Sequence, residues 1–105
     1  DKSTQERYCV SEGDTEGFVN MPLSIAGVRM SIMAKEDDGK IRISIRSKTG
    51  TSANRCARQY FNGGGHENAA GGRLNVPEDV SDVNDVAGYI EKHTQLYFSQ
   101  ENENN

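Results

Sequence analysis

Three consecutive glycines followed at once by a histidine are the residues of this sequence best suited to binding a ligand. Gly63, Gly64 and Gly65 leave a short piece of backbone without side chains, so ligand oxygens can approach its N–H groups directly. Such a nest suits phosphate, and His66 can donate to a phosphoryl oxygen or carry a proton near neutral pH. The alternative is a flexible glycine hinge beside a surface histidine.

Other motifs for chemistry are absent from the sequence. No Lys-Ser or Lys-Thr pair follows the glycines, so the stretch is not a Walker phosphate loop. No metal-binding spacing such as CxxC or HExxH occurs, and we predict no metal site in this chain. Cys56 falls on the apolar face of a predicted helix, which favours a small buried hydrophobe over a reactive thiol.

The charge of the chain is unevenly distributed. The net charge is −4 over 105 residues, yet residues 29–73 contain nine basic and only four acidic side chains. The middle of the chain can therefore attract phosphate while the whole molecule stays acidic. A solvated face of mixed charge is the alternative.

Two segments in which apolar and polar side chains alternate are expected to position several of these basic residues. Residues 28–34 and 41–47 alternate apolar with polar side chains, and the loop 36–39 between them contains glycine. This pattern predicts a β-hairpin. A four-residue loop would set Met30 opposite Ile45 and, on the other face, Arg29 opposite Arg46. Opposed arginines repel unless an anion or a carboxylate lies between them, so the register indicates an anion-binding surface, unless both side chains turn apart into water.

Two helices are expected to flank the glycine stretch. The first starts at Ser52 or Ala53, capped by Ser52 or Asn54, and ends near Phe61; the second runs from about residue 82 to 97 or 98. Their apolar faces comprise Ala53, Cys56, Ala57, Tyr60 and Phe61, and then Val83, Val86, Ala87, Ile90, Thr94 and Tyr97.

The remaining pattern sets the fold class. Residues 73–76 read as a short strand, further strand structure is expected before Val28, and the glycine runs of 63–72 are expected to be neither strand nor helix. Together these predict an α+β fold with a mixed β-sheet that contains a β-hairpin, and two main helices on one face.

We expect one domain over residues 13–98. Residues 1–12 read as a flexible linker or the remnant of an interdomain connection, and 99–105 as a disordered tail. No apolar run is long enough for a membrane span and no signal peptide is visible, so a cytoplasmic location is expected.

The motifs resemble a known family. Residues 62–72 resemble the GGGHxxAAG signature of the DHH-associated domain, which forms the C-terminal part of DHH phosphoesterases. Residues 13–20 resemble the segment that enters this domain in the nano-RNase (oligoribonuclease) and phosphoadenosine-phosphate phosphatase branch. Residues 43–48 resemble the arginine–serine strand of that branch.

The resemblance implies a lid that grips a nucleotide. In the family, an N-terminal DHH domain of the same polypeptide carries two divalent metal ions, usually manganese, and no Asp-His-His occurs here. The resemblance implies that Gly63 to Gly65 offer N–H groups to phosphate, that His66 reaches a phosphate without being a nucleophile, and that Arg46 with Ser47 holds substrate. Arg29 is added to these substrate-binding residues only because the predicted strand register places it opposite Arg46.

Several functions stay open at this stage. Substrates that fit the resemblance are short RNAs, 3′-phosphoadenosine 5′-phosphate and the breakdown products of cyclic dinucleotides. The isolated chain is expected to lack hydrolytic activity, and it could form a homodimer. The alternatives are a stand-alone RNA-binding or tRNA-binding module, of the kind found in alanyl-tRNA synthetases, and an oligomerisation domain.

Overall fold

The fold is described by a computed structural model that covers residues 7–8, 11–12, 18–24 and 28–103. Its elements, in chain order, are β1 (Arg7–Tyr8), β2 (Ser11–Glu12), β3 (Phe18–Ser24), β4 (Val28–Asp37), β5 (Lys40–Ser47), α1 (Ala53–Tyr60), β6 (Gly64–His66), β7 (Ala69–Asn75), the 3₁₀ turn η2 (Val83–Asp85) and α2 (Val86–Glu103). No helix in these ranges is long and apolar enough to cross a membrane.

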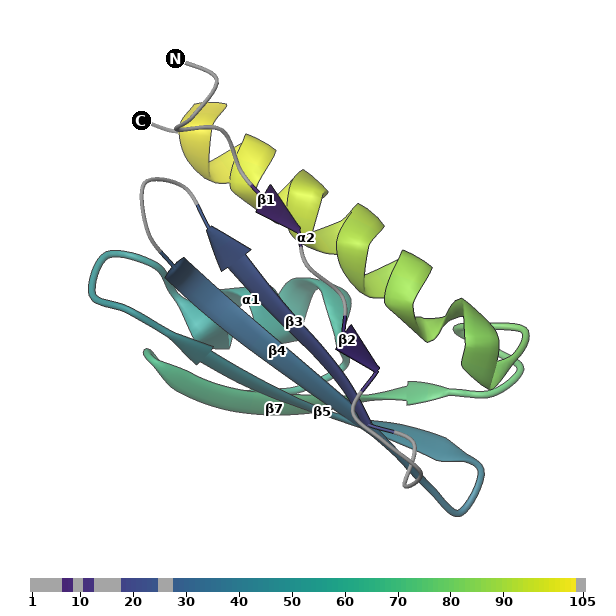
Figure 1. The fold of residues 1–105 in the computed structure, drawn as a ribbon. Helices are drawn as coiled ribbons and strands as arrows, with labels where there is room; N and C mark the ends of the chain where they lie inside the picture. Colours follow the sequence, from purple (N-terminus) through teal and green to yellow (C-terminus); the bar gives the residue numbers. More distant parts are fainter. Residues whose placement is uncertain (1–6, 9–10, 13–17, 25–27, 104–105) are drawn as a thin grey trace.

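The strands form one sheet in the order β1-β3-β4-β5-β7-β6, with β2 also paired to β3. Figure 1 shows β3, β4, β5 and β7 side by side with α1 behind them. The α+β class and the two helices on one sheet face are confirmed. Every described strand pair is antiparallel, whereas a mixed sheet was expected.

The β4–β5 hairpin exists, but its predicted register was wrong by two residues. Asp37 pairs with Lys40, so the loop is a two-residue turn of Asp38 and Gly39, with φ of 56° and 79°. Two positive φ angles are typical of the tight turn that matches the twist of β-strands. A register shift of two residues leaves each side chain on its predicted face but changes the residue that lies opposite it. Ser31, not Arg29, lies opposite Arg46.

The glycine stretch is a β-hairpin, which corrects the expectation that it forms no strand. Strands β6 and β7 pair directly, with Gly64 opposite Gly71 and His66 opposite Ala69. The glycines are needed because backbones meet there without room for side chains. A Cβ on Gly63 would lie 1.9 Å from the carbonyl oxygen of Gly71, and one on Gly72 would lie 2.1 Å from that of Phe61.

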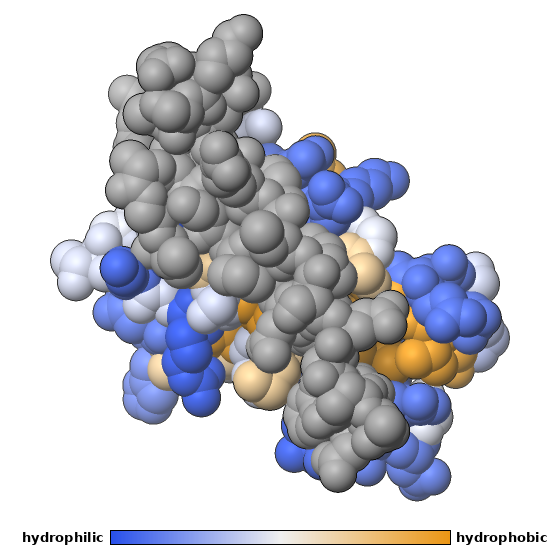
Figure 2. Space-filling model, viewed as in Figure 1, coloured by the Kyte–Doolittle hydropathy of each residue, from blue (hydrophilic) through white to orange (hydrophobic). Residues whose placement is uncertain are grey.

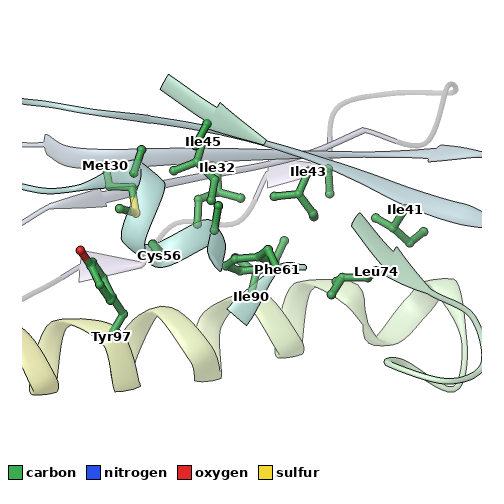
Figure 3. Close-up of a cluster of buried hydrophobic side chains, with 14 of the residues drawn as sticks. Met30, Ile32, Ile41, Ile43, Ile45, Cys56, Phe61, Leu74, Ile90 and Tyr97 are labelled. Atoms are coloured by element: carbon green, nitrogen blue, oxygen red, sulfur yellow. The ribbon is translucent and has the colours of Figure 1, made fainter. Parts of the chain in front are cut away.

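The hydrophobic core lies between the sheet and the two helices. Figure 3 shows isoleucines of β4 and β5 pointing toward α1 and α2, with Phe61 between the layers. Ser52 caps α1 by accepting a hydrogen bond from the N–H of Arg55, which confirms one of the two predicted caps. Cys56 is buried, as predicted, and burial raises the pKa of its thiol to about 12.

Both ends of the predicted domain need correction. Helix α2 continues to Glu103, so residues 99–103 are helical and not part of a disordered tail. Buried Phe98 and the 2.8 Å ion pair between Arg55 and Glu101 fix these turns to the rest of the domain. In the predicted linker, β1 and β2 pair with β3. Cys9 and most of the 13–20 segment lie outside the described residues.

Candidate functional site

One face of the sheet is covered by neither helix, and we call it the open face. The side chains that alternate with core positions along β4, β5, β6 and β7 belong to it. They are Ser31, Met33, Lys35, Arg42, Ser44, Arg46, His66, Ala69, Gly71 and Arg73. Basic and small residues thus dominate this face.

Arg46 and His66 lie in the same row of the open face. Arg46 pairs with Ala69 of β7, and Ala69 pairs with His66 of β6. Two strand spacings separate their backbones, which is about 10 Å. Both side chains are exposed, and Nη1 of Arg46 donates to the carbonyl oxygen of Ile45 at 2.9 Å. The pairing thus brings an exposed arginine and an exposed histidine to the same end of the sheet.

Two of the three glycine N–H groups donate hydrogen bonds to acceptors within the protein. The N–H of Gly63 donates to the carbonyl oxygen of Ala57 at 3.2 Å, and that of Gly65 donates to Oδ1 of Asn54 at 2.9 Å. Two of the three donors expected to bind phosphate therefore already have acceptors. Gly64 pairs with Gly71, and a Cβ on Gly64 would lie 3.2 Å from Oδ1 of Asn54 and 3.3 Å from Cγ of Arg58, so this glycine lets the strand pack closely against α1.

Ser47 and Arg29 have structural contacts. The Ser47 hydroxyl donates to the carbonyl oxygen of Thr51 at 2.6 Å and accepts from Nδ2 of Asn68 at 3.1 Å. Ser47 also falls on the opposite sheet face from Arg46, its neighbour in the strand. Arg29 donates from Nε to Oγ1 of Thr51 at 3.1 Å, and its guanidinium lies 4.5 Å from the Phe98 ring centroid. The predicted Arg29–Arg46 anion pair is therefore wrong.

A depression of about 710 Å³ lies on the open face beside the Arg46–His66 row. Ser44, Gly71, Arg42 and Arg73 are among the residues that line it. Sequence reasoning missed Arg42 and Arg73 as candidates, although Arg42 shares the even-numbered face of its strand with Arg46. In the view of Figure 2, hydrophilic residues lie along the left and right sides of the molecule, and hydrophobic ones show as patches between them.

The described residues contain no group of three or more His, Cys, Asp or Glu side chains that could hold a metal ion. These residues offer no ligand set for the two divalent ions, which the resemblance implies in an N-terminal DHH domain and not in this chain.

The chain is similar to two known proteins. The chain is 36% identical over 73 residues to the bifunctional oligoribonuclease and PAP phosphatase NrnA of Bacillus subtilis, covering 70% of this chain and 23% of that protein. It is 37% identical to the crystal structure of an exopolyphosphatase-related protein from Bacteroides fragilis, with a TM-score of 0.46, covering 70% of this chain and 22% of that one. The chain thus spans less than a quarter of these relatives.

The family model gives the clearest assignment. Residues 5–92 match the model of the DHHA1 domain, and this range includes every open-face residue named above. The match covers more than half of the chain and extends from β1 into α2. The chain belongs to the DHHA1 domain family.

Proposed function

We propose that this chain is the substrate-binding domain of a cytoplasmic, metal-dependent phosphoesterase that hydrolyses short oligoribonucleotides, 3′-phosphoadenosine 5′-phosphate or both. The observation that carries the proposal is the row Arg46–Ala69–His66, which sets a guanidinium and an imidazole on one exposed face. The relative NrnA, named as an oligoribonuclease and PAP phosphatase, supports the substrate class.

The chain's own residues bind and orient the substrate in this proposal. The Arg46 guanidinium can grip a phosphate with two parallel N–H donors, and His66 can donate to a second oxygen of the same group. Both contacts hold the phosphate in place and offset its charge; neither residue is a nucleophile. The metal ions, with manganese expected, would be supplied by an N-terminal DHH domain of the same polypeptide.

The glycine hairpin has a supporting role in this proposal. Gly64 lets β6 lie close to Asn54 and Arg58 of α1, and this contact helps to position His66. Ser47 and Asn68 hold the hairpin turn against the loop that follows β5, and this fixes the relative positions of Arg46 and His66. We therefore assign Ser47 to positioning and leave direct substrate contact to Arg46 and His66.

A titration of the ¹⁵N-labelled chain with 3′-phosphoadenosine 5′-phosphate tests the proposal. Shifts are expected at Arg46 and over residues 63–66, with a dissociation constant of roughly high micromolar to millimolar for so few phosphate contacts. The double change Arg46→Ala with His66→Ala should weaken binding by about tenfold or more. Lys92→Ala is the matched control, because Lys92 is an exposed cation on α2 in the helix layer.

Two results would contradict the proposal. An affinity that the double variant leaves unchanged would remove the open face from ligand binding and favour an oligomerisation domain. Binding of folded tRNA at low micromolar levels or tighter, with a steep dependence on salt, would instead favour a stand-alone RNA-binding module.

A further inference from the structure

The C-terminal part of α2 is bonded to the segment where α1 begins. Figure 3 shows the Tyr97 side chain pointing from α2 toward the sheet, and its hydroxyl donates to the carbonyl oxygen of Ser52 at 2.9 Å. Glu101 accepts from Nη1 of Arg55 at 2.8 Å, and the Glu101 side chain is only 16% exposed. Such a short charge-assisted hydrogen bond is stronger than a neutral one. The end of α2 and the start of α1 are therefore fixed to each other.

Arg29 connects the same part of α2 to the loop between β5 and α1. Its guanidinium lies 4.5 Å from the ring centroid of Phe98, and its Nε donates to Oγ1 of Thr51 at 3.1 Å. Phe98 and Thr51 are both buried, so this cation joins two groups of the protein interior. Arg29 makes no ion pair with an acidic side chain of the described residues. A planar guanidinium suits this position because it can stack on a ring while its edge donates a hydrogen bond.

The loop that Arg29 contacts has one buried residue. Lys48, Thr49 and Gly50 are exposed, and Gly50 has a φ of 95°. Thr51 is buried, and its N–H donates to the carbonyl oxygen of Lys48 at 3.1 Å. The Lys48 N–H in turn donates to the carbonyl oxygen of Arg29 at 3.0 Å. The place of this loop therefore depends on how Thr51 is held in the interior.

The backbone carbonyl of Thr51 extends the connection to the residues proposed to bind the ligand. It accepts from the Ser47 hydroxyl at 2.6 Å and from Nδ2 of Asn68 at 3.3 Å. Ser47 directly follows Arg46 in β5, and Asn68 lies in the turn between β6 and β7, two residues after His66. The position of Thr51 therefore affects both strand ends that carry the proposed ligand contacts.

We propose that Arg29 is a positioning residue for the ligand site, and that the C-terminal part of α2 contributes to ligand binding through it. Arg29 holds Thr51, whose carbonyl anchors the two strand ends that carry Arg46 and His66. The inference rests on the proposed function and adds a requirement to it. A helix on the opposite side of the sheet from the ligand helps to set the affinity, although Arg29 itself does not touch the ligand.

The acceptor of Arg29 allows a matched pair of variants. Thr51→Val keeps the shape of the side chain but removes the hydroxyl that Arg29 binds, whereas Thr51→Ser keeps the hydroxyl. In a titration of the ¹⁵N-labelled chain with 3′-phosphoadenosine 5′-phosphate, Thr51→Val should bind about fivefold more weakly, which corresponds to one hydrogen bond. Thr51→Ser should bind like the wild type. The Ser47 amide, which donates to the Asn68 carbonyl, should exchange with solvent faster in Thr51→Val alone.

A control variant separates positioning from a general loss of stability. Ile41 is buried near the start of β5, at the other end of the strand from Arg46. Ile41→Val removes one methylene from the core and should lower the free energy of unfolding to a similar extent as Thr51→Val, which urea denaturation checks. The ligand affinity of Ile41→Val should nevertheless equal that of the wild type.

A double-mutant cycle tests the part of the helix. Phe98→Leu removes the ring that lies against Arg29 but keeps an apolar side chain in the core. It should weaken ligand binding in the wild type and add no further loss in Thr51→Val, because both changes interrupt the same connected contacts. Additive losses would refute the contribution of α2.

The outcomes distinguish this inference from the proposed function. If Thr51→Val binds like the wild type, or if Thr51→Ser or Ile41→Val loses as much affinity as Thr51→Val, the positioning role is refuted. The proposed function then still stands, provided that Arg46→Ala with His66→Ala weakens binding. If the ligand shifts neither Arg46 nor residues 63–66 in the wild type, the proposed function fails and the positioning role fails with it.

Discussion

The side-chain amide of Asn68 donates a hydrogen bond to the Ser47 hydroxyl at 3.1 Å, across 21 residues of chain. The same amide donates to the carbonyl oxygens of Lys48 at 3.0 Å and Thr51 at 3.3 Å, and the Ser47 N–H donates to the Asn68 carbonyl at 3.1 Å. The β6–β7 turn is thereby tied to the end of β5. The position of His66 relative to Arg46 depends on this connection.

Replacing Asn68 by Ala should lower the stability of the fold. The change removes the donor for three acceptors, and we expect a loss of about 1–2 kcal/mol in the free energy of unfolding. Urea denaturation measures it. Asn84→Ala is the control, because the Asn84 side chain makes one long contact of 3.4 Å with Asp82 at an exposed site. Equal losses in the two variants would show that the Asn68 connection adds no stability.

Glycine-to-alanine changes should have opposite effects at different positions. Gly63→Ala and Gly72→Ala place a Cβ within 2.1 Å of a backbone carbonyl oxygen, so each should cost on the order of 2 kcal/mol or prevent folding. Gly88 lies in α2, and a Cβ there meets nothing within 4 Å. Gly88→Ala should therefore stabilise the helix by about 0.5–1 kcal/mol. Thermal denaturation distinguishes the three variants. Similar melting temperatures for all three would contradict the close approach of the backbone at Gly63 and Gly72.

Stability should fall at alkaline pH. Burial raises the pKa of the Cys56 thiol from 9.0 to about 12 and that of the Tyr97 hydroxyl from 10.0 to about 12, with a smaller contribution from Glu101 in both cases. At pH values between the pKa of the unfolded state and that of the folded state, the unfolded chain releases protons that the folded chain retains. Deprotonation therefore favours unfolding. The stabilisation is complete below pH 9 and is lost as pH rises toward 12.

Urea midpoints at pH 8 and pH 10.5 measure this effect. We expect the free energy of unfolding to decrease on the order of 2 kcal/mol over this interval. Cys56→Ala should be less stable at pH 8 and should show a smaller decrease, since only Tyr97 then contributes. A variant whose decrease matches that of the wild type would exclude the thiol as a cause.

Sequence patterns predicted the faces of the sheet better than its register. Alternation with a period of two assigns Ile43 to the core and Arg46 to the opposite face, and any register shifted by two residues keeps that assignment. The pattern therefore could not decide between a four-residue loop and a two-residue turn. The signal that could have decided it was Asp38-Gly39, a dipeptide typical of two-residue hairpin turns.

The glycine hairpin was harder to predict for a different reason. Glycine is a poor strand former in local propensity, so Gly64 and Gly65 read as a loop. Their strand exists because Gly63 and Gly72 approach the backbones of Gly71 and Phe61, and such long-range contacts leave no local pattern. His66 was nevertheless predicted as a site residue from its type, and Arg46 from the strand register and the family resemblance. Both align with Ala69 in the strand pairing.

Because both helices pack on the same side of the sheet, the arginines of the open face are exposed to bulk water in the isolated domain. Two unit charges 4 Å apart then attract by about 1 kcal/mol, compared with about 4 kcal/mol where a protein surface lowers the effective dielectric constant to ~20. Any second body that closes over the strands would thus strengthen every phosphate contact at once, without moving a single arginine. The strength of an anion contact on this face therefore depends on how much water is excluded from around the arginines.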